Sequence, residues 1–465
     1  MDGETIQEVA SRLPLAEAVW RMFEQIGSPE FLEGVFERHR GRSYQLEISF
    51  PLFVQLIGDA LLEHEGSGRK SFQRSIEAGE LLASAQAAYG KLRRVPLSLS
   101  VGWLCETSAE LQRVYPVRLR GGRVPLSLRR MEVVIYDGKT LKYVARRLKA
   151  LQKIRGGLLG GRLVVALSLS TGLVVAMGAH EDGESGEQPL VPSVLAQVRE
   201  VFAETPRLHV ADRGYCDLIQ MARFSAAGDH FVVRWNRRLK FTRDESRPVQ
   251  HGVDENGRPY WEEWGWAGTG ARRRYVRRIH LALGPKEEDL VVATDLLDPD
   301  EYPAADLLAV YDRRWGIERM FQKVTEVFHL KRLIGTTARA TIFQAAFCFL
   351  LYNMIEVMRA YIAEGARRDI ETISLELLFY DVHRQLVAWN EVLKPEETLE
   401  YFAATRSTKP LSRWLEELLH DQWSDLWIKS PSNTHRTAPP HAEDRPTSGH
   451  LSVYRALRQA LARGS

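Results

Sequence analysis

Three acidic residues stand where their carboxylates could work together. Asp137 directly follows the apolar run of residues 131–136, Asp212 follows the short apolar run of residues 208–211, and Glu318 lies in a later helical segment. Carboxylates that converge repel one another unless hard cations neutralise them, and ligands that are all oxygen select Mg²⁺ or Mn²⁺. Two such ions ~3.5–4 Å apart can activate a water or a 3′-hydroxyl and stabilise the leaving oxygen. The trio therefore predicts a two-metal site for phosphodiester chemistry.

Glu318 has two notable neighbours in its helical segment. Tyr311, Arg314 and Glu318 are spaced i, i+3 and i+7, so a continuous helix would present all three on one face. An arginine beside a metal-binding glutamate can hold a phosphate with two parallel hydrogen bonds. We therefore expect Arg314 to contact a phosphate next to the scissile bond, with Tyr311 supporting it.

The elements around the two aspartates predict how they are positioned. Strand-like and helix-like runs between residues 131 and 235 follow the order β-β-β-α-β-α-β, which is the order of the ribonuclease H-like fold. In that fold the first and fourth strands are neighbours, so Asp137 and Asp212 are expected side by side at one edge of the sheet. A helix that begins near residue 303 and continues past Glu318 can pack across this edge.

The remaining segments predict an α/β protein with helical flanks. Apolar positions at helical spacing dominate both ends of the chain, whereas residues 237–300 are rich in Trp, Arg, Gly and β-branched residues. The expected organisation is a helical N-terminal domain (1–112), whose function is either DNA binding or plain packing; a ribonuclease H-like catalytic core (113–236 and 301–345); a mostly β insertion (237–300); a helical C-terminal region (346–429); and a flexible tail (430–465).

Charge is distributed unevenly along the chain. The net charge is only +3, but residues 113–162 contain 14 Lys and Arg against two acids, a local net charge of +12. Such a concentration predicts a surface that faces a polyanion, with a merely solvated basic face as the alternative.

Composition limits the class of protein. The 465 residues are 45% hydrophobic and 26% charged, as in ordinary globular proteins, and the three cysteines contain no CxxC pair. This excludes a cysteine-based zinc module and fits a reduced, cytosolic compartment. The apolar runs 163–179 and 340–355 are shorter than the ~20 residues of a membrane helix, so no membrane association is expected and the second run predicts a buried helix.

The motifs together match one family signature. Tyr311, Arg314 and Glu318, with Trp315 after the arginine, fit the pattern Tyr-x2-Arg-x3-Glu-x6-Lys, and residues 212–215 fit Asp-x-Gly-Tyr. The chain thus resembles the DDE transposases of bacterial insertion sequences, specifically the insertion-sequence-four family. It departs from the pattern at the lysine, where Thr325 stands. Arg319 and Lys323 are the candidates to supply the missing DNA contact, so the expected DNA-binding residues are Tyr311, Arg314, Trp315, Arg319 and Lys323.

The resemblance implies an activity and its partners. Members of the family bind the terminal inverted repeats of their element as a homodimer, cut there with Mg²⁺ or Mn²⁺, and join the 3′-ends to target DNA. The resemblance also implies Asp137, Asp212 and Glu318 as catalytic residues and a cytoplasmic, nucleoid-associated bacterial protein. Two alternatives stay open: a ribonuclease H-like nuclease without strand transfer, and an inactive DNA-binding remnant.

The insertion combines aromatic and basic residues. Four of the 11 tryptophans lie within 32 residues, and five arginines follow at once. Arginines that hold phosphates beside an indole that stacks on an unpaired base would suit a distorted DNA end, whereas tryptophans could equally form the core of the insertion. The residues concerned are Trp235, Trp261, Trp264, Trp266, Arg272, Arg273, Arg274, Arg277 and Arg278.

Overall fold

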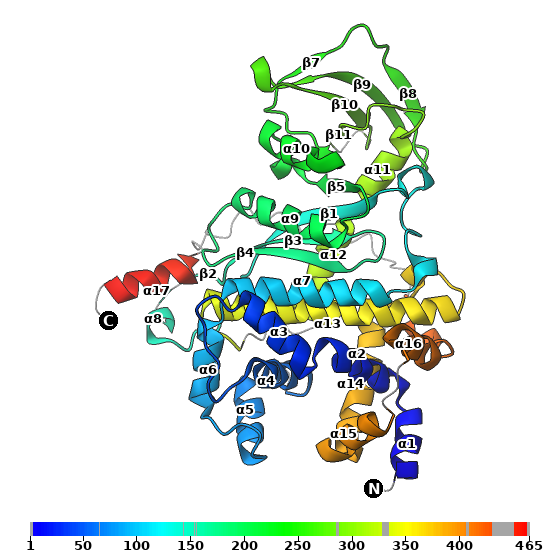
Figure 1. The fold of residues 1–465 in the computed structure, drawn as a ribbon. Coiled ribbons are helices and arrows are strands. Elements are labelled where there is room, and N and C mark those ends of the chain that lie inside the picture. The colour runs from blue at the N-terminus through cyan, green and yellow to red at the C-terminus, as the bar shows by residue number, and fades with distance from the viewer. Residues whose placement is uncertain are drawn as a thin grey trace.

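The computed structural model places a β-sheet between a helical block and a strand-rich upper part (Figure 1). It describes residues 3–64, 66–142, 144–152, 154, 156–284, 288–327, 334–405, 409–429 and 451–462. Two long helices, α7 (Leu97–Val114) and α13 (Ala338–Gly365), lie side by side beneath the sheet and separate it from the rest of the helical block.

The centre of the sheet has ribonuclease H-like topology. Its five core strands run in the order β4-β3-β1-β5-β6; β4, β3 and β1 are antiparallel, and β1, β5 and β6 are parallel. The predicted fold class is thereby confirmed, including the adjacency of the first and fourth core strands. The core strands are β1 (Glu132–Thr140), β3 (Arg162–Ser168), β4 (Val174–His180), β5 (Arg207–Ala211) and β6 (His230–Arg234).

Burial on both faces explains why these strands are continuous apolar runs. Along β1, Val133 and Ile135 join one hydrophobic cluster, and the alternate residues Val134 and Tyr136 join another. The first cluster includes α7 and α13 and also α11 (Ala304–Asp312) and α12 (Trp315–Glu326). The second includes α9 (Val191–Val201) and α10 (Leu218–Phe224) on the opposite face.

The insertion is mostly β, as predicted, and it continues the core sheet. Strand β11 pairs antiparallel with β6, and the order then runs β11-β10-β9-β7, with β8 also on β9. The result is one ten-stranded sheet. The inserted strands are β7 (Phe241–Arg243), β8 (Gln250–Val253), β9 (Pro259–Ala267), β10 (Arg274–Leu281) and β11 (Leu290–Thr294).

Helices from both ends of the chain form the helical block. Helix α2 packs against α14 and α16, and α7 packs against α13. Helix α13 is long and apolar enough to cross a membrane, but its apolar stretch is wholly buried inside the protein, as the core helix that the sequence predicts. The other members are α1 (Gly3–Ser11), α2 (Pro14–Ile26), α3 (Pro29–His39), α4 (Phe50–Leu62), α5 (Gly68–Glu77), α6 (Ala85–Arg94), α14 (Leu375–Val392), α15 (Pro395–Ala404) and α16 (Leu411–Leu419).

The C-terminal tail is ordered where the structure describes it. Residues 430–450 lie outside the described residues, but 451–462 form strand β12 (Leu451–Ser452) and helix α17 (Val453–Ala462). Strand β12 pairs with β2 (Leu158–Leu159), and α17 packs against α8 (Lys149–Gln152). The expectation of a flexible tail is therefore wrong for 451–462, because Val453 is buried and Arg455 forms an ion pair with Asp182 at 2.6 Å.

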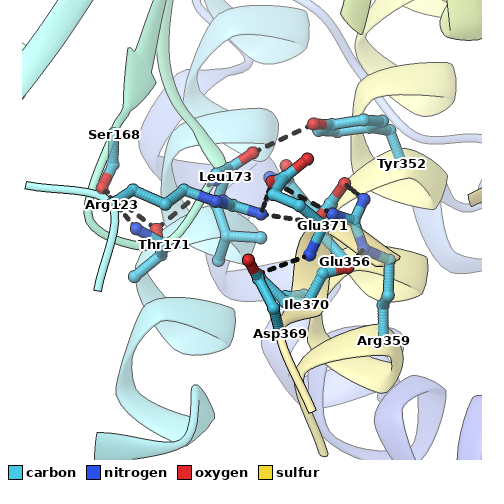
Figure 2. Close-up of polar contacts among 12 residues, drawn as sticks. Arg123, Ser168, Thr171, Leu173, Tyr352, Glu356, Arg359, Asp369, Ile370 and Glu371 are labelled. Atoms are coloured by element: carbon cyan, nitrogen blue, oxygen red, sulfur yellow. Dashed lines mark hydrogen bonds and ion pairs between the residues drawn. The ribbon is translucent and has the colours of Figure 1, made fainter. Parts of the chain in front are cut away.

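A cluster of ion pairs joins the core to the helical block (Figure 2). Arg123, which precedes β1, lies 2.7 Å from Glu371, and Arg359 of α13 lies 3.3 Å from the same carboxylate. Arg359 also pairs with the buried Glu356 at 2.6 Å. Nearby, the Tyr352 hydroxyl donates to the carbonyl of Gly172 in the β3–β4 turn. Segments that lie 180 or more residues apart in the sequence are thus fixed to one another by charge and hydrogen bonds.

We expect part of the protein's stability to depend on the Glu371 charge. Burial opposes ionisation of Glu371, but Arg359 and Arg123 outweigh it and lower the pKa of this carboxyl from 4.5 to about 2. A lowered folded-state pKa stabilises the protein above the unfolded pKa, and this stabilisation is lost as the pH falls from about 4.5 to about 2. Glu371→Gln should therefore lower the melting temperature at neutral pH, and its difference from wild type should shrink across that window.

Thermal melts of both proteins between pH 7 and pH 2 measure this difference. Glu400→Gln is the matched control, because Glu400 is exposed and its replacement should change little at any pH. A Glu371→Gln difference that persists unchanged at pH 2 would contradict the assignment of the effect to carboxylate charge.

Candidate active site

The register of the sheet brings Asp137 and Asp212 side by side. The parallel pairing of β1 with β5 ends at Tyr136 and Ala211, and the two aspartates are the next residues on their strands. Successive residues of a strand point to opposite faces of the sheet. Both aspartates therefore point to the same face as Ile135, which is the face that α11 and α12 cover. One detail differs from the prediction: β1 does not end before Asp137 but continues to Thr140, because its pairing with β3 extends past the aspartate.

Glu318 reaches this edge from a helix that begins anew. The prediction of one continuous helix from residue 303 is wrong, because α11 ends at Asp312 and α12 starts at Trp315. Between them, Arg314 N–H donates to the Tyr311 carbonyl, and Gly316 N–H donates to the Arg313 carbonyl. Such i→i−3 bonds tighten the chain at the junction. Helix α12 packs against β1, the strand that carries Asp137.

Although the helix is broken between α11 and α12, the predicted side chains still lie together. The Tyr311 hydroxyl donates to Asp212 Oδ1 at 3.1 Å, and the Arg314 guanidinium pairs with Glu318 Oε1 at 3.0 Å. Arg314 is only 4% exposed, whereas the Glu318 side chain is 41% exposed. The Arg314 Nε is buried and has no hydrogen-bond partner among the described residues.

Electrostatic effects link the acids to one another. Burial raises the pKa of Asp137 to about 6, and the charges of Glu318 and Glu187 add to this, while the Gly138 amide and Arg314 act in the opposite direction. Burial would lower the pKa of Arg314, but Tyr311, Asp212 and Glu318 raise it overall. Asp137, Asp212 and Glu318 thus all interact with one guanidinium.

The donor atoms at this edge suit a hard cation. The acids offer only oxygen, which is the ligand atom that Mg²⁺ and Mn²⁺ prefer, and burial together with the charges of Glu318 and Glu187 raises the pKa of Asp137. Across the described residues, however, no three Asp, Glu, His or Cys side chains are grouped closely enough to hold a metal ion. Tyr311 and Arg314 instead occupy oxygens of Asp212 and Glu318 in this arrangement.

The other predicted DNA-binding residues differ in availability. Trp315 is 56% exposed with the Arg314 guanidinium 4.9 Å from its ring, and Arg319 is exposed. Lys323 pairs with Glu376 of α14 at 2.7 Å, so its ammonium is already engaged. Thr325 donates to the Phe321 carbonyl of its own helix at 2.6 Å. Of the two candidates to replace the missing lysine contact, Arg319 is the more accessible.

One acidic residue at this edge of the sheet was not predicted from the sequence. Glu187, in the connection between β4 and α9, interacts with Asp137 and accepts a hydrogen bond from Tyr215 at 3.1 Å. It belongs to no strand end and no signature motif, so nothing in its sequence context indicates its position.

Comparisons with known proteins identify what the chain is similar to. Residues 129–354 match the family described as "Transposase DDE domain". A probable transposase for insertion sequence element IS5377 from Geobacillus stearothermophilus is 23% identical over 295 residues, which cover 62% of this chain and 71% of that protein. Among solved structures, a piggyBac transposase synaptic complex with hairpin DNA aligns over 92% of this chain and 90% of its own, with 10% identity and a TM-score of 0.39.

The sheet order and its acidic edge define a ribonuclease H-like catalytic core. Residues 129–354 are thus a transposase DDE domain, and the chain is a DNA transposase similar to those of insertion sequences.

The tryptophans of the insertion fall into two groups. Trp235 and Trp264 are 5% and 2% exposed, and the Trp264 indole donates to the Leu297 carbonyl, so both are core residues and cannot stack on DNA here. Trp261 stacks on His280 with ring centres 3.5 Å apart, and Trp266 is half-buried against Tyr275.

Two of the five arginines that follow these tryptophans in the sequence stabilise the sheet. Arg277 is fully buried and pairs with Glu262, and Arg278 pairs with Glu263. Their predicted role as phosphate ligands is wrong, because cross-strand carboxylates on β9 already neutralise them. Arg272 and Arg273 remain exposed at the β9–β10 turn.

We expect mutations to separate the buried from the half-buried tryptophans. Trp264→Ala should lower the free energy of unfolding by ~3–5 kcal/mol, because it leaves a large cavity in the insertion. Trp266→Ala should cost only about 1–2 kcal/mol, since it removes an edge contact with Tyr275 and a cation–π contact with Arg273. Urea denaturation measures both, and equal losses would contradict the distinction.

Proposed function

We propose that this transposase cuts DNA at the ends of its insertion sequence and joins the 3′-ends to target DNA, with Asp137, Asp212 and Glu318 as ligands of two Mg²⁺ or Mn²⁺ ions. The observation that carries the proposal is the strand register, which puts Asp137 and Asp212 next to each other where the pairing of β1 with β5 ends. The pairing of Arg314 with Glu318 supports it, because it brings the third acid to the same guanidinium that acts on Asp137.

Bound divalent ions would supply the activation of a water or a 3′-hydroxyl and the stabilisation of the leaving oxygen. The residues of the chain do the remaining work. Asp137 lies on β1 and Asp212 directly follows β5, so the sheet sets the positions of both ligands. Tyr311 holds Asp212 in one orientation through its hydroxyl. Glu318, on a helix and partly exposed, completes the set from the opposite side.

Arg314 is proposed to bind the phosphate that is cut. Its guanidinium is buried and oriented by Glu318, and its Nε is free of partners within the described part of the chain. A planar guanidinium presents several N–H groups in one plane, and two of them can hold two phosphate oxygens at once. Its position beside the acids would place that phosphate at the carboxylates.

A basic surface next to the site is proposed to hold the DNA duplex. The connection from β1 to β3 carries four exposed cations within eight residues, and α6 lies beside it through the contact of Arg147 with Tyr89. Contacts of lysine and arginine with phosphates are independent of sequence and weaken with salt. The cations are Lys142, Arg146, Arg147 and Lys149.

The finer properties of the proposal follow from the family. A homodimer would bring two inverted repeats together, and one acidic site would carry out each step, since each is an in-line attack on a phosphodiester. The setting is the bacterial cytoplasm, where the nucleoid provides target DNA. The alternative of a nuclease without strand transfer has the same site and differs only in the fate of the 3′-hydroxyl.

Asp137→Asn is the direct test of the site. It keeps the shape of the side chain but removes its charge, so cleavage of a duplex that carries the inverted repeats flanking the gene should fall at least ~100-fold. Binding to the same duplex should stay within a few-fold of wild type, because phosphate contacts supply most of the affinity. Cleavage is measured on labelled duplex with Mg²⁺, and strand transfer by the joining of labelled 3′-ends to a plasmid.

Each outcome of that test has a meaning. Asp137→Asn protein that still cleaves at the wild-type rate would refute the proposed site. Wild-type protein that cleaves but never joins ends to the plasmid would favour the nuclease.

Arg314→Lys and Arg314→Ala test the phosphate contact. Both should slow cleavage, since a point charge cannot reproduce the planar fork, and Arg314→Ala should also weaken binding of the cut end. Arg319→Ala on the exposed face of the same helix is the matched control, and it should affect binding without a comparable loss of cleavage rate. Unchanged affinity and rate in Arg314→Ala would refute the role.

A further inference from the structure

Glu187 occupies the space between the two aspartate-bearing segments. A methyl group on Gly138 would collide with the Glu187 carboxylate, so the residue after Asp137 must be glycine for this carboxylate to lie where it does. On its other side the carboxylate accepts a hydrogen bond from the Tyr215 hydroxyl at 3.1 Å. Tyr215 belongs to the turn that starts at Asp212. One side chain thus contacts both the strand of Asp137 and the turn of Asp212.

Glu187 is itself held firmly in position. Arg162 of β3 pairs with its second oxygen at 3.0 Å. The next residue, Gln188, donates to the Gly214 carbonyl and accepts from Gln220 on α10, so the connection between β4 and α9 is attached to the Asp212 turn at two successive residues.

The far end of the same connection is also anchored. Glu181 pairs with Arg339 of α13 at 2.8 Å, and Asp182 pairs with Arg455 of α17 at 2.6 Å. Residues 181–188 therefore form a brace with fixed ends, and Glu187 is the part of this brace that meets the acidic edge.

The contacts of Glu187 serve geometry. Arg162 neutralises its charge, and its carboxylate lies between Gly138 and the Tyr215 hydroxyl. These contacts fix the distance between β1 and the turn after β5.

We propose that Glu187 is a positioning residue of the active site, which through Tyr215 and Gly138 holds the Asp212 turn against the strand of Asp137. This inference rests on the proposed function of Asp137 and Asp212. Glu187 acts through other residues, so it need not touch DNA or reacting atoms.

A double-mutant cycle with Glu187→Ala and Tyr215→Phe tests the link. Tyr215→Phe removes only the hydroxyl and keeps the buried ring, so it should fold normally even if Glu187→Ala does not. Each single variant should slow cleavage of the inverted-repeat duplex about 10- to 100-fold, as expected for misplaced catalytic groups. The double variant should be no slower than the slower single variant, because both break the same link. Losses that multiply would overturn the proposal, since Glu187 and Tyr215 would then act separately.

Hydrogen–deuterium exchange supplies a readout that does not depend on activity. In metal-free protein without DNA, amides of residues 212–216 should exchange faster in Glu187→Ala and Tyr215→Phe than in wild type, with no comparable change in the helical block. Glu204→Ala is the matched control, because Glu204 is exposed beyond the C-terminal end of α9 and its replacement removes the same charge. Unchanged exchange of 212–216 in both variants would overturn the proposal.

Asp137→Asn in the same cleavage assay distinguishes a failure of the proposed active site from a failure of the role proposed for Glu187. If it cleaves normally, the proposed active site fails whatever Glu187 does. If it is inactive while Glu187→Ala and Tyr215→Phe match wild type in both cleavage and exchange, only the role of Glu187 is refuted.

Discussion

A buried guanidinium, that of Arg314, is the constraint on which the catalytic edge depends. Carboxylates on the first strand, just after the fourth core strand and on a later helix repel one another at this half-buried edge unless a positive charge lies nearby. Arg314 is 4% exposed, pairs with Glu318 and acts on Asp137 and Asp212. This charge explains the break between α11 and α12, because the chain turns at Arg314, the residue that interacts with all three acids.

The sheet supplies the rigidity that this charge cluster needs. Parallel pairing of β1 with β5 sets the two aspartates in register, and α12 on the same face brings the glutamate. The ion pairs of Arg123 and Arg359 with Glu371 then fix the core to the helical block. Local position at the site is thus determined by backbone hydrogen bonds, and the arrangement of the larger parts by side-chain charge.

Much of this could be predicted from the sequence, and the reason is physical. Strands buried on both faces leave continuous apolar runs, so β1, β3, β4 and β5 and the aspartates that follow them were visible. The break at residues 313–314 was not, because Tyr311 and Glu318 have helical spacing in either case and only their tertiary partners decide the bend. The docking of residues 451–462 was equally hidden, since β12 has only two residues and its partner, β2, lies almost 300 positions earlier. Glu187 was missed for the same reason: its contacts with Arg162 and Tyr215 exist only in the folded chain.

The continuity of the sheet gives the insertion a protective role. Strand β6 carries Val232 and Val233 at full burial, and its outer hydrogen-bonding edge is occupied by β11 of the insertion. A core trimmed to its five strands would expose that edge as a row of unpaired amides and carbonyls flanked by valines, which is the geometry that recruits strands from other molecules. Removal of the insertion would therefore leave this edge of the catalytic sheet without a partner strand, and a shortened protein would need another strand or a helix to cover it.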